Sequence, residues 1–180
     1  MRRYEGPVHT VATCDELERA MADIRLAHVV GFDTETRPAF RKGESYLPSI
    51  AQVATARAVY VFALREADVH AGLAEMLTSS DITKVGVALA YDLSTLKQHF
   101  DFAEQRVVDL GHVARRNGCR QTGVRNLAGL FLGFRIPKGA STSNWAAPKL
   151  TSAQITYAAT DAWICRELYL KFEADGWLRS

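Results

Sequence analysis

The sequence has few residues of the kinds that define disulfide-rich, collagen-like or disordered chains. It contains three cysteines, five prolines and twelve glycines in 180 residues, which excludes a collagen or low-complexity composition. Cys14, Cys119 and Cys165 are widely spaced and form no CxxC pair, so neither a disulfide framework nor a zinc site is predicted. The apolar runs are much shorter than the roughly 20 residues of a membrane-spanning helix, and no secretory signal follows the basic start. We therefore expect a cytoplasmic protein with reduced thiols and no membrane contact.

Acidic residues are also missing from one long segment. Strictly between Asp109 and Asp161 there is no Asp or Glu, and seven basic residues give this segment a charge of +7, whereas the whole chain carries +2. Such asymmetry is typical of a surface that binds an anionic partner. A helical pair with a solvated basic surface explains it equally well. The basic residues are Arg115, Arg116, Arg120, Arg125, Arg135, Lys138 and Lys149.

The length and the order of elements predict one α/β domain over residues 1–180. A chain of this size and 48% hydrophobic content is expected to form a single core. Capping boxes begin helices after Thr13 and Thr151, the second running to about Glu173. Three strands in a meander, then strands reached through helices, predict a mixed central β-sheet flanked by helices. The expected strands are 29–35, 50–55, 58–64, 83–89 and 106–109, and the other helices are 69–77, 92–100, 110–116 and 124–132.

Two carboxylates follow each other on the strand predicted over 29–35. Side chains at positions i and i+2 of a strand share a face, so Asp33 and Glu35 are expected side by side. Their repulsion is relieved by a cation, and two hard oxygen donors suit Mg²⁺ or Mn²⁺. The ordinary alternative is a pair of solvated acids at a strand end.

Two further acidic positions carry little weight individually. Tyr157 and Asp161 are four apart in the last predicted helix, so phenol and carboxylate project from one face, as they do in many surface helices. Asp92 opens a helix after a buried strand, where a carboxylate also serves as an ordinary cap. Three separated acidic sites around one sheet, beside a basic segment without acids, favour a functional interpretation.

Taken together, these pieces resemble the DEDDy-type 3′-5′ exonucleases of the ribonuclease-H-like superfamily, especially the Werner-type exonuclease domain and ribonuclease D. They occur in the family's order and span nearly the whole chain. The histidine subtype has its His five positions before the last Asp, and that position is Thr156 here, which favours the tyrosine subtype. The matching pieces are VVGFDTETRP, LPSIAQVAT, KVGVALAYDLSTL, STSNW and LTSAQITYAATDAW.

The resemblance implies a ribonuclease-H-like fold and two-metal-ion catalysis. Phosphodiester bonds would be hydrolysed from the 3′ end of DNA or RNA, releasing nucleoside 5′-monophosphates, with two divalent ions, Mg²⁺ or Mn²⁺, about 4 Å apart. Asp33 would bridge both ions, Glu35 and Asp161 would complete the first site, and Asp92 would help to hold the second. Tyr157 would orient the attacking water, because a phenol with an ordinary pKa near 10 is a poor base at neutral pH.

Three residues near the STSNW motif are candidate substrate contacts. Lys138 would contact a backbone phosphate and Arg135 would assist it, although both are also explained as solvated charges. Trp145 would stack on a base or, as the sequence favours, brace its loop against the last helix.

Two other functions stay open on the sequence alone. A nano-ribonuclease restricted to very short RNA shares these motifs, and a non-catalytic nucleic-acid-binding module would keep the fold without turnover. The expected partner is nucleic acid with a free 3′ end. Because neither a helicase nor an accessory helical domain is recognised, we expect affinity to come from the domain, a homo-oligomer or an accessory protein.

Overall fold

A six-stranded mixed sheet forms the centre of the computed structural model, which describes residues 1–179. The strand order is β1-β4-β3-β2-β5-β6, so β2 lies inside the sheet. Strands β2, β3 and β4 are antiparallel to their neighbours in this meander, whereas β1 pairs in parallel with β4, and β5 pairs in parallel with β2 and β6. The strands are β1 (Val8–Val11), β2 (Val29–Glu35), β3 (Ile50–Ala54), β4 (Val59–Ala63), β5 (Thr83–Gly86) and β6 (Val107–Asp109).

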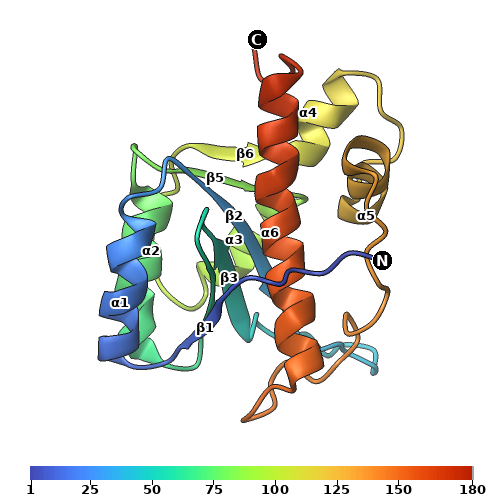
Figure 1. The fold of residues 1–180 in the computed structure, drawn as a ribbon. Helices are drawn as coiled ribbons and strands as arrows, with labels where there is room; N and C mark the ends of the chain where they lie inside the picture. The colour runs from blue at the N-terminus through green and yellow to red at the C-terminus, as the bar shows by residue number, and fades with distance from the viewer. Residues whose placement is uncertain (180) are drawn as a thin grey trace.

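Helices cover both faces of this sheet, and the long α6 crosses one face diagonally (Figure 1). Side chains of α1, α2 and α3 pack with Phe32 and Phe62 on one face. Side chains of α4, α5 and α6 pack around the other face with Val85 and Val61. The helices are α1 (Cys14–Ile24), η1 (Ala67–Val69), α2 (His70–Thr78), α3 (Leu89–Leu96), α4 (Leu110–Arg116), α5 (Val124–Leu127), the π-helix η2 (Ala128–Leu132) and α6 (Ser152–Ala174). None of the helices in residues 1–179 is long and apolar enough to span a membrane.

Several sequence predictions are confirmed by these elements. Strand β2 covers the residues expected, and both capping boxes are present at Thr13 and Thr151. The hairpin between β3 and β4 closes where it was expected, with the Thr55 N–H donating to the Ala58 carbonyl at 2.9 Å. The α/β class and the mixed sheet flanked by helices are therefore confirmed.

The first strand was not predicted. Strand β1 is only four residues long, and the side chains of His9 and Thr10 at its centre are exposed. A run this short has too few apolar positions to give a periodic signal. Its pairing with β4 makes it an outer strand of the sheet.

The boundary between β5 and α3 lies earlier in the chain than the sequence predicted. The predicted strand 83–89 ends at Gly86, and the helix expected from Asp92 begins at Leu89. Ala88 adopts a left-handed conformation with φ 57°, and the Leu89 N–H donates to the Asp109 carboxylate at 3.1 Å. A carboxylate distant in sequence thus accepts from the start of the helix, which local patterns do not reveal.

The helix predicted over 124–132 consists of two parts. Regular α-helix ends at Leu127, and a π-helical turn continues from Ala128 to Leu132. Gly133 then takes φ 68° and ends the segment. Periodicity alone does not distinguish the wider π turn from a continuous α-helix.

The first residues of the chain lie across α6 and reach the loop that follows η2. The Tyr4 N–H donates to Thr160 Oγ1 at 3.0 Å, and the Arg2 N–H donates to the Arg135 carbonyl at 2.8 Å. The Arg2 guanidinium also lies over the Phe134 ring, 4.5 Å from its centroid. This N-terminal arm, residues 1–7, therefore ties α6 to the loop that carries Arg135.

Gly31 permits β2 and α6 to pack closely. A Cβ atom at this position would overlap the carbonyl oxygen of Ala162, a backbone atom that cannot move aside cheaply. We predict that Gly31→Ala lowers the free energy of unfolding by about 3 kcal/mol, since it overpacks the centre of the fold. Urea denaturation will measure this change, and Gly129→Ala, which meets only ordinary contacts, is the control. Equal stability of the two variants would contradict the prediction.

Candidate active site

Three carboxylates from β2 and α6 converge at the end of the central strand. Oxygen atoms of Asp33, Glu35 and Asp161 all lie within 4.8 Å of one another. Asp33 and Glu35 point toward α6 because they alternate with Phe32 and Thr34 along the strand. Glu35 is 9% exposed and Asp161 7% exposed. The cluster is therefore largely withdrawn from water.

Neighbouring groups hold these carboxylates in place. An Asp33 carboxylate oxygen accepts from the Thr34 N–H at 2.9 Å. Gln52 lies opposite Asp33 in the β2–β3 register and is fully buried. Its side-chain amide donates to Glu35 Oε1 at 3.5 Å and to the Ala158 carbonyl at 3.2 Å. Gln52 thus links the strand carboxylate to α6, a role the sequence did not indicate although the residue lies in the LPSIAQVAT piece.

Burial and mutual repulsion raise the pKa values throughout the cluster. Burial, followed by the charges of Glu35 and Asp161, raises the pKa of Asp33 well above its ordinary value. Burial and the charge of Asp161 raise the pKa of Glu35 to about 8, although the hydrogen bond from Gln52 opposes the shift. Burial raises the pKa of Asp161 to about 7 against the charge of Arg125. The raised pKa values show that the charged forms of these three acids lack enough neighbouring positive charge to stabilise them.

The donor set fits a divalent cation. All three groups offer hard carboxylate oxygens, and within residues 1–179 none of them is paired with a basic side chain at ion-pair distance. Hard cations such as Mg²⁺ take oxygen ligands of this kind. A bound cation would also stabilise the charged forms that burial disfavours. The cluster can therefore bind a metal ion.

Asp92 approaches this cluster from α3. The leucines of α3 pack on the face of the sheet opposite to the one that α6 covers. It does not belong to the group of three converging carboxylates. Its charge nevertheless contributes to the raised pKa values of Asp33 and Glu35. Burial raises the pKa of Asp92 itself to about 6, while a hydrogen bond from the Thr34 hydroxyl opposes this shift. Asp92 thus lies beside the cluster, within electrostatic reach.

Tyr157 lies one helical turn before Asp161, as the spacing predicted. Burial, then the charge of Asp161, raises the pKa of Tyr157 to about 12. Its hydroxyl donates a hydrogen bond that lowers the pKa of Asp161. The same oxygen accepts from Arg125 Nη2 at 3.2 Å. Sequence reasoning counted Arg125 only within the basic segment, because nothing local relates α5 to α6.

The predicted substrate contacts divide into two groups. Lys138 and Arg135 are exposed on the loop between η2 and α6, where they are accessible to an anion. Trp145 is only 1% exposed and packs with Ile50, Val61 and Ala158. Its ring centroid lies 6.0 Å from that of Tyr157. In this structure Trp145 braces its loop and Tyr157, and it has no free face on which a base could stack.

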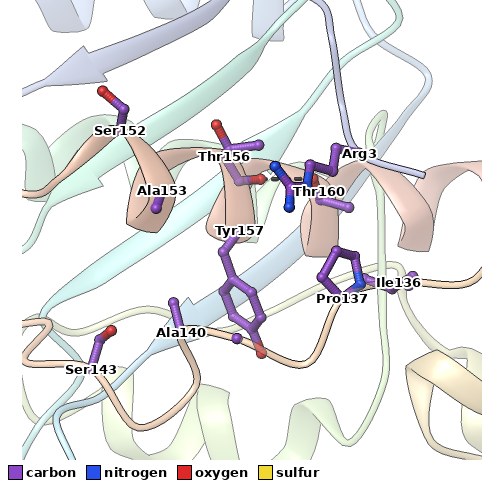
Figure 2. Close-up of a pocket in the computed structure, with 11 residues that line it drawn as sticks. Arg3, Ile136, Pro137, Ala140, Ser143, Ser152, Ala153, Thr156, Tyr157 and Thr160 are labelled. Atoms are coloured by element: carbon purple, nitrogen blue, oxygen red, sulfur yellow. Dashed lines mark hydrogen bonds between the residues drawn. The ribbon is translucent and has the colours of Figure 1, made fainter. Parts of the chain in front are cut away.

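A cavity of about 520 Å³ lies between the first half of α6 and the loop around Pro137. Figure 2 shows Tyr157 projecting from α6 toward this loop, with Arg3 of the N-terminal arm above Thr160. The cavity wall is mainly apolar, and its volume falls within the range of ordinary small-ligand sites. Tyr157 contributes both to this cavity and to the carboxylate cluster.

Comparisons with known proteins agree with the geometry. A family model described as 3′-5′ exonuclease matches residues 8–177. The bifunctional 3′-5′ exonuclease/ATP-dependent helicase WRN of Mus musculus is 32% identical over 149 residues, covering 79% of this chain and 11% of that protein. The Aedes aegypti Nibbler EXO domain superposes with a TM-score of 0.82 at 26% identity, covering 97% of this chain and 90% of that one.

A more distant solved structure shares the fold. Trypanosoma brucei RNase D, in complex with RNA U12, has a TM-score of 0.81 at 17% identity, covering 93% of this chain and 62% of that one. The first three curated relatives are much longer than this chain, which spans 16%, 27% and 11% of their lengths.

The raised carboxyl pKa values predict how the stability of metal-free protein depends on pH. Because Glu35 and Asp161 have pKa values of about 8 and 7 against ordinary values of 4.5 and 3.8, the folded state binds more protons than the unfolded state. Their contribution is complete below about pH 4 and is lost as pH rises through about 8. We predict that the unfolding temperature of chelator-treated protein falls between about pH 5 and 8, measured by calorimetry.

The control for this prediction is Glu35→Gln, which removes the carboxylate with the higher of these two pKa values. Its unfolding temperature should fall less over the same interval. Added Mn²⁺ should reduce the fall in the wild-type protein, because the ion stabilises the charged carboxylates. A wild-type temperature that rises with pH, or an equal fall in Glu35→Gln, would contradict the assignment.

Proposed function

Since the chain belongs to the 3′-5′ exonuclease family, we propose that it is a metal-dependent hydrolase that removes nucleotides from the 3′ end of nucleic acid. The products would be nucleoside 5′-monophosphates. The convergence of Asp33, Glu35 and Asp161 within 4.8 Å supports this function most directly. Tyr157 at its spacing from Asp161, with Thr156 where the other subtype has histidine, supports the DEDDy subtype.

We propose that the carboxylates hold two divalent ions, Mg²⁺ or Mn²⁺. Asp33 would contact both ions, Glu35 and Asp161 would complete the first site, and Asp92 would help to hold the second. When bound, such ions neutralise the phosphate and increase the acidity of a coordinated water. The position of Asp92 beside the cluster, bonded to Thr34, is consistent with a more distant ligand.

Tyr157 would act as a hydrogen-bond donor that orients the attacking water. With a pKa of about 12, its hydroxyl keeps its proton at neutral pH and cannot serve as a general base. Gln52 would keep Glu35 directed toward the site through its amide hydrogen bond. The chain's own groups would therefore position the reactants.

The substrate proposed is a strand with a free 3′ end. Its terminal nucleoside would enter the cavity beside Tyr157, whose wall is mainly apolar, while exposed Lys138 and Arg135 would contact backbone phosphates. An RNA substrate gains support from the RNA-bound ribonuclease D with the same fold. Within residues 1–179, the thiols of Cys14, Cys119 and Cys165 are free, which agrees with the cytoplasmic location that we propose.

We further propose that residues 1–180 form a single exonuclease domain, which acts alone, as a homo-oligomer or with an accessory protein. Two alternatives are separated by one assay. Labelled single-stranded DNA, 3′-recessed duplex, RNA and dinucleotides are offered at fixed salt. Digestion of dinucleotides alone would indicate a nano-ribonuclease. A Mn²⁺-induced thermal shift without hydrolysis of any substrate would indicate a binding module.

The first functional prediction concerns Asp33, which is central to the proposed metal ligands. Asp33→Ala should lower the rate of 3′-end digestion by at least about a hundredfold, because the cations contribute several kcal/mol to transition-state stabilisation. The rate is measured with labelled DNA and RNA in Mg²⁺ and in Mn²⁺. Asp101→Ala, which removes an exposed carboxylate outside the cluster, should remain fully active. Full activity of Asp33→Ala would refute the proposed function.

A second prediction concerns the exposed Lys138 on the loop between η2 and α6. Lys138→Gln should raise KM equally for substrates of every sequence, while kcat stays unchanged. The slope of log KM against log salt concentration should fall by about one. Initial rates are measured over a range of salt concentrations. Lys171→Gln, which removes a charge at the far end of α6, is the control. An unchanged salt dependence in Lys138→Gln would exclude the phosphate contact.

A further inference from the structure

Arg125 is a half-buried cation on α5 whose side chain donates a hydrogen bond to a neutral group. Its Nη2 donates to the Tyr157 hydroxyl oxygen at 3.2 Å, across 32 positions of sequence. Within residues 1–179, no carboxylate lies at ion-pair distance from its nitrogens. Other guanidinium groups, such as that of Arg25 with Glu75, have direct ionic partners. The placement of Arg125 is therefore not explained by an ordinary ion pair.

The hydrogen-bond capacity of a phenol shows what this contact does. A guanidinium has donors only, so the Tyr157 oxygen must act as the acceptor toward Arg125. The single Tyr157 proton is then left for a partner other than Arg125, and Asp161 of the carboxylate cluster lies one turn further along α6. The bond from Arg125 therefore fixes one side of the phenol oxygen as an acceptor and leaves its proton for the side of the carboxylate cluster.

Packing alone does not fix this direction. Trp145 lies against the Tyr157 ring, with centroids 6.0 Å apart, and so restrains the position of the ring. The hydroxyl hydrogen still rotates about its C–O bond, and only hydrogen bonds fix its orientation. The Ser141 hydroxyl also acts on this oxygen and lowers the pKa of Tyr157, but it carries no charge. A charge-assisted donor such as Arg125 is roughly twice as strong as a neutral one.

We infer that Arg125 is a positioning residue, which holds the Tyr157 hydroxyl so that its proton points into the carboxylate cluster. This inference rests on the proposed function, in which that proton orients the attacking water. Arg125 acts through Tyr157 and not on the substrate. Its loss therefore lowers kcat while leaving substrate affinity unchanged.

A structural role for the Arg125 side chain has little support. Helix α5 is anchored by Leu127, and the following turn by Ala128, both of which are fully buried in the core. Within residues 1–179 the Arg125 side chain forms one hydrogen bond, the bond to Tyr157. Arg125→Gln should therefore fold normally and unfold at the wild-type temperature.

The test is a double-mutant cycle between Arg125→Gln and Tyr157→Phe at saturating Mn²⁺. We expect Arg125→Gln to lower kcat about tenfold with KM unchanged, as for loss of one charge-assisted hydrogen bond. The double variant should be no slower than Tyr157→Phe alone, since both changes remove the oriented Tyr157 hydroxyl. Arg125→Lys, which keeps a charged donor, should give an intermediate kcat. Arg25→Gln, which removes a guanidinium bonded to Glu75 instead, should keep the wild-type kcat.

A binding measurement without turnover separates this role from direct contact with phosphate. Calorimetry with a nucleoside 5′-monophosphate and Mn²⁺ should give the same affinity for Arg125→Gln and wild type. Weaker product binding, or losses in kcat that multiply in the double variant, would overturn the inference, because Arg125 would then act on the substrate or the carboxylates independently of Tyr157. If Asp33→Ala is inactive while those losses multiply, only this inference fails. If Asp33→Ala is fully active, the proposed function fails with it.

Discussion

The close packing of α6 on β2 determines the character of the whole site. Gly31 lets the helix backbone approach the central strand at Ala162, and the preceding helix residue, Asp161, meets Asp33 and Glu35. Bringing three acids together away from water is unfavourable in the absence of a counter-charge. The fold tolerates this arrangement because the surrounding sheet and helices are well packed. The packing thus holds the carboxylates close together, and a bound cation would reduce their mutual repulsion.

The basic groups near this cluster are kept apart from it in a consistent way. Arg125 donates its hydrogen bond to a phenol and forms no ion pair with the acids in residues 1–179, and Lys138 and Arg135 are on an exposed loop. A lysine or arginine in direct contact would neutralise the carboxylates and compete with a metal ion. Because the basic side chains do not pair with the carboxylates, the cluster stays free to bind a cation. The same basic side chains stay available to bind an anionic strand.

The sequence predicted those features that depend on local spacing. The shared face of Asp33 and Glu35 follows from strand alternation, and the capping box at Thr151 correctly begins the helix that carries Asp161. Features set by distant contacts were beyond it. The start of α3 depends on the Asp109 carboxylate, and the contact of Arg125 with Tyr157 depends on how α5 meets α6. The contacts of Trp145 with residues of β3 and β4 were likewise not predicted, although the sequence did favour a bracing role over stacking on a base.

The position of α6 along the chain has a consequence for biosynthesis. Residues 33 and 35 leave the ribosome early, whereas the helix that completes their surroundings is translated more than a hundred positions later. Until α6 emerges, one face of the sheet lacks its main covering element, and Asp161 is not yet present beside the two early acids. The contacts of residues 2 and 4 with positions 135 and 160 must also wait. Assembly of the acidic site is therefore a late event, coupled to completion of the core rather than to synthesis of its first ligands.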